Sequence, residues 1–215
     1  PRAKLTNKKI CDLMRDAIEK MGAPADLVIA IEIPSLETTN ELMQQCDRVL
    51  ATGGGAMVTA AYSSGTPALG VGVGNAVITV DDTADLDDAA TKIHMSKTLD
   101  LAASCSSDNS VILVDSIYEP MLDRLKAKGG YLCNAEEKEK LRNTIWDDEG
   151  HLNTAIVAQP AQKIASMAGL DVPATTEFYI VIEDGWGKDF PFSGEKLSVV
   201  MALYRASDID HAIEL

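Results

Sequence analysis

The chain has 215 residues, a formal net charge of −14 at pH 7, and 46% hydrophobic residues against 24% charged ones. This balance is typical of a globular protein rather than a disordered one, and no apolar run is long enough to span a bilayer. The negative charge argues against nucleic acid and anionic membranes as partners. An anionic cofactor would therefore have to be held by local features such as helix N-termini.

The first third of the chain alternates predicted helices and strands. Amphipathic spacing predicts a helix over residues 8–21, and a second helix is predicted over residues 36–45. Continuous apolar runs predict strands at residues 27–31 and 48–52. Helices that alternate with buried strands are typical of a doubly wound α/β sheet.

Three glycines, Gly53, Gly54 and Gly55, directly follow the second strand and open a predicted helix over residues 56–62. Glycines let a ligand approach the backbone, and a helix N-terminus offers free N–H groups to a phosphate. A tight strand-to-helix turn without any ligand explains the run equally well. The spacing also differs from the dinucleotide fingerprint of the usual Rossmann unit.

A strand that begins after Pro67 runs into valines alternating with glycines, which indicates close backbone packing, and we place a domain boundary near residue 73. The second domain is predicted to open with a strand at 76–80 and a helix at 87–97, capped by Asp85 or Asp87. Further strands are predicted at 110–115, 178–182 and 198–204, and further helices at 118–128, 134–146 and 160–167.

Cys105 lies among small and polar residues on a predicted turn between a helix and a buried strand. A thiol in such a setting is reachable, which makes Cys105 a candidate nucleophile. Cys133 is its rival, because it precedes a predicted helix N-terminus that would lower a thiol pKa. The apolar residues before Cys133 favour packing as its role. None of the four cysteines has zinc or redox-motif spacing, so we expect reduced thiols in a cytoplasmic protein.

Four stretches of the chain resemble the aldehyde dehydrogenase family, and most closely its branch that acylates coenzyme A. They are residues 51–58, 68–75, 96–105 and 192–198. The resemblance implies that residues 1–73 form the C-terminal part of a Rossmann-like nucleotide-binding domain and residues 74–215 an incomplete α/β catalytic domain. The chain would then be an internal piece of a longer protein. The pattern departs at residues 99–102, where relatives usually carry an aromatic residue before the Asp and Asn-Gly after it.

The resemblance also implies roles for individual residues. Cys105 would attack the aldehyde carbonyl, and coenzyme A would accept the acyl group from the resulting thioester. The positions that match the NAD or NADP site are Pro34, Thr52, Gly53, Gly54, Gly72, Glu195 and Leu197. Glu195 would bond the nicotinamide ribose, Leu197 would lie beside the nicotinamide ring, and no metal is implied. A second oxyanion donor is expected from a segment that precedes the chain, and assembly into a homo-oligomer is expected.

The sequence also gives indications of the substrate and of the acyl acceptor. The serines around Cys105 resemble the branch that oxidises sulfoacetaldehyde. Val71 matches the position where hydrolytic relatives carry a glutamate that activates water, so coenzyme A rather than water is the expected acceptor.

Other functions remain open from the residues alone: a hydrolytic aldehyde dehydrogenase, a Cys–His hydrolase and a non-catalytic nucleotide-binding module. His94 precedes Cys105 by eleven residues, but the predicted helix carries it away from the thiol. No histidine has a companion at metal-ligand spacing. Burial of Cys105 under apolar side chains would favour the module over both enzymes.

Overall fold

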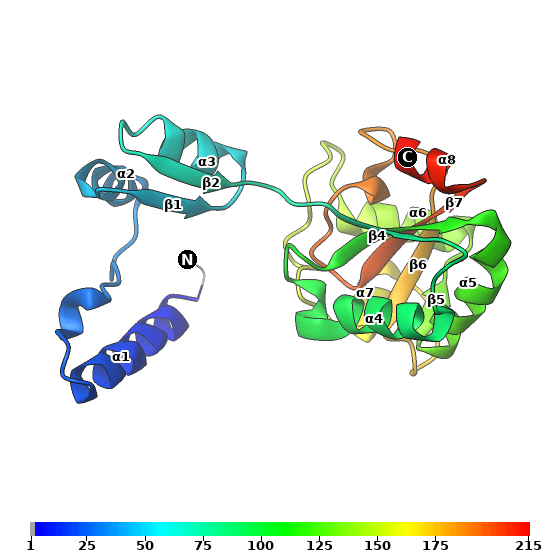
Figure 1. Cartoon of the computed structure of the whole chain (residues 1–215), viewed down its shortest axis with the longest axis horizontal. Coiled ribbons are helices and arrows are strands. Elements are labelled where there is room, and N and C mark those ends of the chain that lie inside the picture. Colours follow the sequence, from blue (N-terminus) through cyan, green and yellow to red (C-terminus); the bar gives the residue numbers. More distant parts are fainter. Residues whose placement is uncertain (1–2) are drawn as a thin grey trace. The chain divides into compact units, whose positions relative to one another are not determined.

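The computed structural model describes residues 3–215 and consists of two compact units (Figure 1). The first unit ends at Gly72, and the second comprises Val73–Leu215. Every pair of neighbouring strands in both units is parallel, so the predicted α/β class with parallel sheets is confirmed. Within the described residues, no helix combines the length and apolar character that a bilayer span requires.

The first unit contains a two-stranded parallel sheet with helices beside it. Its elements are α1 (Lys4–Lys20), a 3-10 turn (Ala25–Leu27), α2 (Leu36–Gln45), β1 (Val49–Thr52), α3 (Gly55–Tyr62) and β2 (Ala68–Val71). The Ser35 hydroxyl caps α2 by accepting from the Thr38 N–H at 3.0 Å. Among the residues of this unit that the structure describes, three hydrophobic side chains form the buried core: Met43, Ala51 and Ala61.

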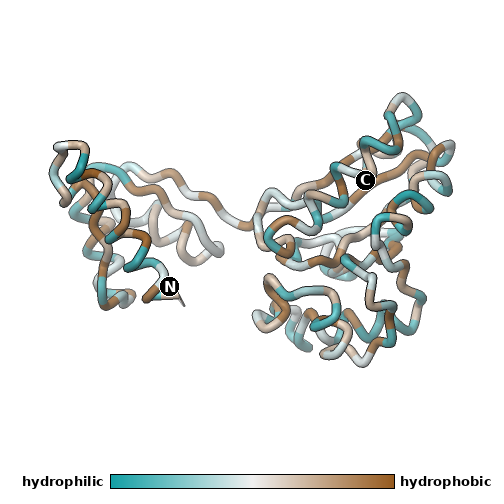
Figure 2. Tube along the Cα trace, turned by 90° about the horizontal axis from the view of Figure 1, so that it is seen from below, coloured by the Kyte–Doolittle hydropathy of each residue, from teal (hydrophilic) through white to brown (hydrophobic). Residues whose placement is uncertain are grey.

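The prediction of a strand over residues 27–31 is wrong. The chain forms a 3-10 turn at Ala25–Leu27 and continues without regular structure, leaving Ile29 77% exposed. A strand exists only with a hydrogen-bonded neighbour, and no described segment pairs with these residues. The amphipathic helix is confirmed as α1, whose apolar residues Ile10, Leu13 and Met14 lie about half exposed. Hydrophobic residues recur along this unit in Figure 2.

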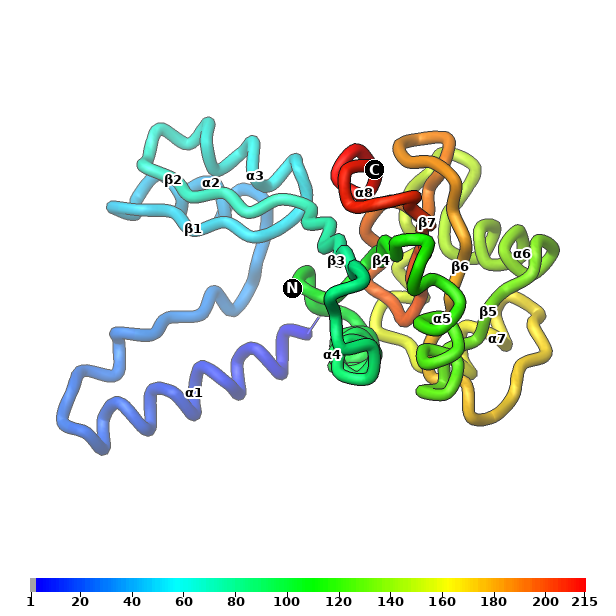
Figure 3. Tube along the Cα trace, turned by 45° about the vertical axis from the view of Figure 1, so that its right-hand side comes forward, coloured from blue at the N-terminus to red at the C-terminus, as the bar shows by residue number. Residues whose placement is uncertain are grey.

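The second unit holds a five-stranded parallel sheet in the order β3-β4-β7-β6-β5 (Figure 3). Its strands are β3 (Ala76–Val80), β4 (Asp108–Val114), β5 (Gly130–Leu132), β6 (Phe178–Ile182) and β7 (Val200–Ala206). Its helices are α4 (Leu86–Thr98), α5 (Tyr118–Ala127), α6 (Ala135–Ile145), α7 (Ala161–Ala168) and α8 (Ile209–Glu214). Shorter 3-10 turns lie at Leu99–Ala102, Asp115–Ile117 and Pro191–Ser193.

The order of the strands determines where the helices lie. The connections from β3 to β4 and from β4 to β5 run in one direction across the sheet, so right-handed crossovers place α4 and α5 on the same face. These two helices contact each other, and α6 contacts α7. Both faces of the central strands are therefore covered, and every residue of β4 is buried.

Local signals explain where these helices begin and end. Asp85, one of the two predicted caps, accepts from the N–H groups of Asp87 and Asp88 at 3.0 and 3.1 Å. Asn134 and Glu137 form a capping box at the start of α6. The helix α7 ends at Gly169, whose φ of 63° is the left-handed conformation that glycine adopts without strain.

An ion pair with a buried carboxylate and a half-buried lysine joins α6 to the residue that follows β6. The Glu183 carboxylate is almost fully buried and pairs with the Lys138 ammonium, which also donates to the Ile182 carbonyl at 2.7 Å. Removing the lysine alone leaves a buried carboxylate without a partner. We therefore expect Lys138→Met to lower the free energy of unfolding by about 3 kcal/mol, measured by urea unfolding.

The matched control is Lys140→Met on the same helix. Lys140 pairs with Glu136 one turn earlier, and both side chains are exposed. Its loss should change the free energy of unfolding by about 0.5 kcal/mol or less. Equal effects of the two variants would show that the Glu183 carboxylate is not buried in solution.

Candidate active site

Cys105 is exposed on a turn that links the end of the Leu99–Ala102 3-10 turn to β4. The Ser107 N–H donates to the Ser104 carbonyl at 3.0 Å, and the Ser104 and Ser106 hydroxyls lie 2.9 Å apart. Among residues 3–215, the Cys105 backbone N–H donates to no protein acceptor. The turn therefore presents a thiol beside a free N–H, which can stabilise negative charge on an atom that the sulfur attacks.

The backbone that leads into this turn is strained. Asp100, Leu101 and Ala102 have φ values of 48°, 54° and 56°, the left-handed region that residues with a Cβ seldom adopt. Each such residue costs of order 1 kcal/mol and persists only where the surroundings hold it. Here Ala102 is buried in the core and Leu101 packs against it. Strain of this kind is concentrated at functional sites, which supports the turn as the site.

Gly74, Cys105 and Glu195 meet at one point although they are far apart in sequence. A Cβ on Gly74 would lie 3.1 Å from the Cys105 carbonyl oxygen, 3.7 Å from Cys105 Cβ and 3.6 Å from Glu195 Oε1. Only a residue without a side chain fits comfortably between the two neighbours. The structure thus brings together Cys105 and Glu195, two of the residues singled out in the sequence.

The Glu195 carboxyl has an unused oxygen in this position. Its Oε1 is buried and accepts no hydrogen bond from any described residue. Burial raises the pKa of Glu195, and the Gly74 backbone N–H opposes that rise. A buried acceptor without a donor is costly, so Oε1 is suited to accept a hydrogen bond from a hydroxyl group of a bound ligand.

Two buried lysines lie near this site, and sequence reasoning missed both. The Lys196 ammonium is fully buried and donates to the carbonyls of Phe192 and Gly194 at 2.5 and 3.0 Å. Lys97 on α4 is 2% exposed and interacts with Asp108. Burial lowers the pKa of Lys97 to about 7 despite the opposing effect of Asp108. Burial and the nearby Lys97 also lower the pKa of Lys196.

The lowered pKa of Lys97 predicts a dependence of stability on pH. The ordinary lysine pKa is 10.5 and the folded value is about 7, so between these pH values the unfolded chain binds more protons than the folded chain. The free energy of unfolding therefore rises with pH across this window, and below pH 7 the full cost of the buried charge is present. We expect Lys97→Met to be more stable than the wild type at pH 6.5, with the advantage shrinking by about 3 kcal/mol at pH 9.5.

Urea unfolding of both proteins at the two pH values measures this difference. Lys92→Met is the control, because Lys92 lies exposed on the same helix and pairs with Asp88 at 2.5 Å. Its effect should be small and nearly independent of pH over this range. A Lys97→Met difference that stays constant with pH would show that Lys97 keeps its charge throughout.

The residues expected to contact a cofactor fall in both units. In the first unit, Thr52 ends β1 beside the end of β2. Gly53 follows it, and the Gly53 N–H donates to the Val71 carbonyl at 3.1 Å. Gly72 directly follows β2, and Gly54 is the N-cap of α3, with nothing within 4 Å of a Cβ built there. These four residues therefore share the carboxyl edge of the strands, where α/β sheets bind ligands.

The remaining three expected residues lie elsewhere. Pro34 precedes the cap of α2 rather than following either strand. Leu197 adjoins Lys196 in the second unit and has a φ of 46°, and its carbonyl accepts from the Ala158 N–H at 3.1 Å. Glu195 is the residue that lies beside Cys105, as described above.

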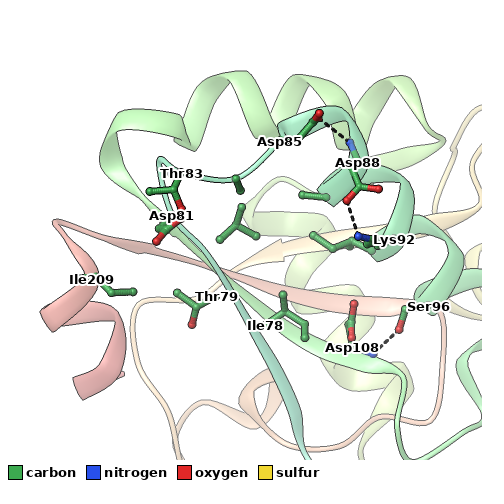
Figure 4. Close-up of a pocket in the computed structure, with 14 residues that line it drawn as sticks. Ile78, Thr79, Asp81, Thr83, Asp85, Asp88, Lys92, Ser96, Asp108 and Ile209 are labelled. Carbon is green, nitrogen blue, oxygen red and sulfur yellow. Dashed lines mark hydrogen bonds and ion pairs between the residues drawn. The ribbon is translucent and has the colours of Figure 1, made fainter.

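A cavity of about 630 Å³ lies along β3 and α4 (Figure 4), and Cys105 is not among the residues that line it. Asp81, Asp85 and Asp88 line it, together with Lys92, which Asp88 already engages. Asp108 also lines it, and its N–H donates to the Ser96 hydroxyl at 2.9 Å. Its lining includes no cysteine or histidine, so the Cys105 turn is the candidate nucleophilic site.

The two rival residues from the sequence, Cys133 and His94, make other interactions. Cys133 is buried, and burial raises its pKa to about 12, so the thiol stays protonated near neutral pH. His94 lies on α4, and its Nε2 is 2.5 Å from Glu177 Oε2. The expectation that no histidine has a companion at metal-ligand spacing is wrong for His151. Its ligand atoms and those of Asp147 and Glu149 lie within 4.8 Å of one another on an exposed loop.

Sequence and structure comparisons match this chain to known proteins. A model of the aldehyde dehydrogenase family matches residues 3–138. The sulfoacetaldehyde dehydrogenase (acylating) of Cupriavidus necator is 46% identical over 217 residues, which cover 100% of this chain and 44% of that protein. A crystal structure of an acetylating aldehyde dehydrogenase from Geobacillus thermoglucosidasius is 39% identical with a TM-score of 0.95, covering 100% of this chain and 48% of that one.

A more distant solved structure contains a bound thioester. It is a propionaldehyde dehydrogenase of Rhodopseudomonas palustris with bound propionyl-CoA, 28% identical with a TM-score of 0.88, and it covers 100% of this chain and 48% of that one. The chain thus spans about half the length of these matched proteins.

Proposed function

Because the chain belongs to the aldehyde dehydrogenase family, we propose that the full-length protein oxidises a short aldehyde to its acyl-CoA thioester, with NAD or NADP as hydride acceptor. The reaction passes through a thioester on Cys105. The observation that carries the proposal is the exposed thiol with a free backbone N–H, placed beside Glu195 across Gly74. The first unit serves as part of the nucleotide-binding domain and the second as the catalytic domain, in a cytoplasmic homo-oligomer.

In this mechanism Cys105 reacts as a thiolate. Its sulfur forms a bond to the aldehyde carbon, and the electron pair of the C=O bond moves onto oxygen. The Cys105 N–H stabilises the resulting oxyanion by donating to it. As the oxyanion collapses, a hydride leaves the carbon and the thioester remains on Cys105. The thiol of coenzyme A then attacks this carbonyl, loses its proton, and displaces the Cys105 thiolate as acyl-CoA forms.

The second unit fits part of a nicotinamide cofactor. The orphaned Glu195 Oε1 is a buried acceptor that a ribose hydroxyl can satisfy. Gly74 leaves open the space between this oxygen and Cys105, which a Cβ would fill. When bound, the cofactor supplies the hydride acceptor. In the second unit, Glu195 holds and orients the cofactor. For the first unit, taken by itself, we propose that Thr52, Gly53, Gly54 and Gly72 contact a nucleotide at the carboxyl edge of its two strands.

The similarity to relatives narrows the substrate. The Cupriavidus necator protein carries the name of a sulfoacetaldehyde dehydrogenase (acylating), and serines surround Cys105 in this chain. We therefore propose sulfoacetaldehyde as a substrate, with acetaldehyde and propionaldehyde as the unsubstituted alternatives.

The test is a panel of these three aldehydes with the full-length protein. Each is supplied with NAD or NADP, with and without coenzyme A, while absorbance at the NADH wavelength is followed and the acyl-CoA product is identified by mass spectrometry. Formation of acyl-CoA in step with reduced cofactor is expected. Absence of cofactor reduction with every aldehyde would contradict the proposal.

A further inference from the structure

The segment that precedes Glu195 is held by two buried donors from different parts of the second unit. The Asn109 amide, on β4, donates through Nδ2 to the Gly194 carbonyl at 2.7 Å and to the Ser193 carbonyl at 3.2 Å. The Lys196 ammonium donates to the same Gly194 carbonyl at 3.0 Å. The carbonyl that leads directly into Glu195 thus accepts from both donors.

The same amide also reaches the other side of Glu195. Asn109 Nδ2 donates to Asn75 Oδ1 at 2.6 Å, and Asn75 directly follows Gly74. The Gly74 backbone in turn lies against the Glu195 carboxyl, because a Cβ on Gly74 would be 3.6 Å from Glu195 Oε1. Asn109 itself stands four residues after Cys105. One buried side chain therefore joins the three segments that carry Gly74, Cys105 and Glu195.

We propose that Asn109 is a positioning residue, whose amide fixes the Glu195 carboxyl relative to the Cys105 thiol without contacting substrate or cofactor itself. The inference rests on the proposed function, because the position of Glu195 matters to the reaction only if a cofactor hydroxyl binds its free oxygen. A displacement of about 1 Å at such a group can reduce a rate about a hundredfold.

The chemistry of the site explains why an amide is needed. All three acceptors around Nδ2 are carbonyl or amide oxygens, so only a donor fits between them. Asn109 is 4% exposed, so water cannot readily replace a lost donor. An aspartate of the same size would place negative charge against these oxygens, and we expect Asn109→Asp to be more damaging than Asn109→Ala.

A double-mutant cycle on the full-length protein tests the inference. Asn109→Ala should lower kcat/KM for the nicotinamide cofactor about 30-fold while changing KM for the aldehyde by less than about twofold. If Asn109 acts through Glu195, the two effects are not additive. Adding Asn109→Ala to the Glu195→Ala variant should then lower kcat/KM for the cofactor by less than about threefold. Fully additive effects would overturn the proposal.

Two further variants separate positioning from simple structural damage. Ser110 is the next residue of β4, and its buried hydroxyl has no partner among the described residues, so Ser110→Ala should leave the kinetics unchanged. Asn75→Ala removes only the acceptor at the edge of the cluster. It should lower kcat/KM for the cofactor, as Asn109→Ala does, but by a smaller factor. This second variant keeps the test possible if Asn109→Ala does not fold.

Alkylation of Cys105 by iodoacetamide, without aldehyde or cofactor, separates this inference from the proposed function. Glu195 lies next to Cys105 across Gly74, so moving or neutralising its carboxylate removes the same charge from the surroundings of the sulfur. Asn109→Ala and Glu195→Gln should therefore change the alkylation rate at one fixed pH in the same direction, and Ser110→Ala should not. Shared changes in a protein that oxidises no aldehyde would contradict the proposed function and leave the positioning role standing. Unchanged rates in an active enzyme would overturn the positioning role.

Discussion

Replacing Cys105 with alanine in the full-length protein should lower aldehyde oxidation at least about a thousandfold, equivalent to about 4 kcal/mol of transition-state stabilisation. The reason is that the rival thiol, Cys133, cannot replace it. Cys105 is exposed beside Gly74 and Glu195, whereas Cys133 is buried with a pKa raised to about 12. The initial rate of cofactor reduction with saturating aldehyde measures the effect.

Cys133→Ala is the matched control for this experiment. The thiol of Cys133 packs in the core, so its loss should cost about 1 kcal/mol of stability and leave most of the activity. Acid quenching of the wild type during turnover, followed by peptide mass spectrometry, should place the acyl group on the peptide that contains Cys105. An active Cys105→Ala variant together with an inactive Cys133→Ala variant would reverse the assignment.

Elements with strong local signals could be predicted from the sequence. The capping box at Asn134 and Glu137, the left-handed Gly169 and the apolar run of β6 act within a few residues, and the structure shows all three. Exposure of Cys105 also followed from its small and polar neighbours. Such signals are readable because the interactions that produce them are local.

Features that depend on distant partners could not be predicted. The segment 27–31 has the composition of a strand but has no neighbour among the described residues. Lys97 and Lys196 look like ordinary surface lysines in the sequence and are nevertheless buried. The strand predicted from residue 198 begins at Val200, because the left-handed Leu197 and the turn before it precede the ladder.

In the candidate site, too, some features could be predicted from local signals and others depend on distant partners. Cys105 and Glu195 could be singled out by residue type and by resemblance, but the contact across Gly74 depends on the fold. The same is true of Asn109, whose three acceptors come from residues 75, 193 and 194. A single asparagine in a buried strand carries no sequence signal that distinguishes it from a residue that only packs.

The expected acyl acceptor is coenzyme A rather than water. The resemblance places Val71 where hydrolytic relatives carry the glutamate that activates water, and valine cannot accept a proton. A thiol needs far less help, because its pKa is near 8.5 and a few per cent is thiolate at neutral pH. Without coenzyme A, the full-length protein should reduce about one cofactor per active site and then slow at least about a hundredfold.

Glu195 provides the strongest physical objection to this expectation. It lies beside Cys105, and burial raises its pKa, which makes its carboxylate a stronger base than an exposed one. If Glu195 activated water, free carboxylic acid would form steadily without coenzyme A, and Glu195→Gln would stop it. Product analysis by mass spectrometry distinguishes the acid from acyl-CoA. Steady acid formation at the rate seen with coenzyme A would therefore contradict the assignment of the acceptor.

Restoring a base tests the role of Val71 directly. Val71→Glu should raise turnover without coenzyme A about 10- to 100-fold, because general-base catalysis typically contributes about 10²–10⁴-fold and an introduced base is not ideally placed. Val71→Gln has the same size but cannot act as a base, so it should leave hydrolysis slow. The gain with glutamate should also disappear at low pH, where the carboxylate is protonated. Equal hydrolysis by both variants would show that the side chain at this position does not determine the acceptor.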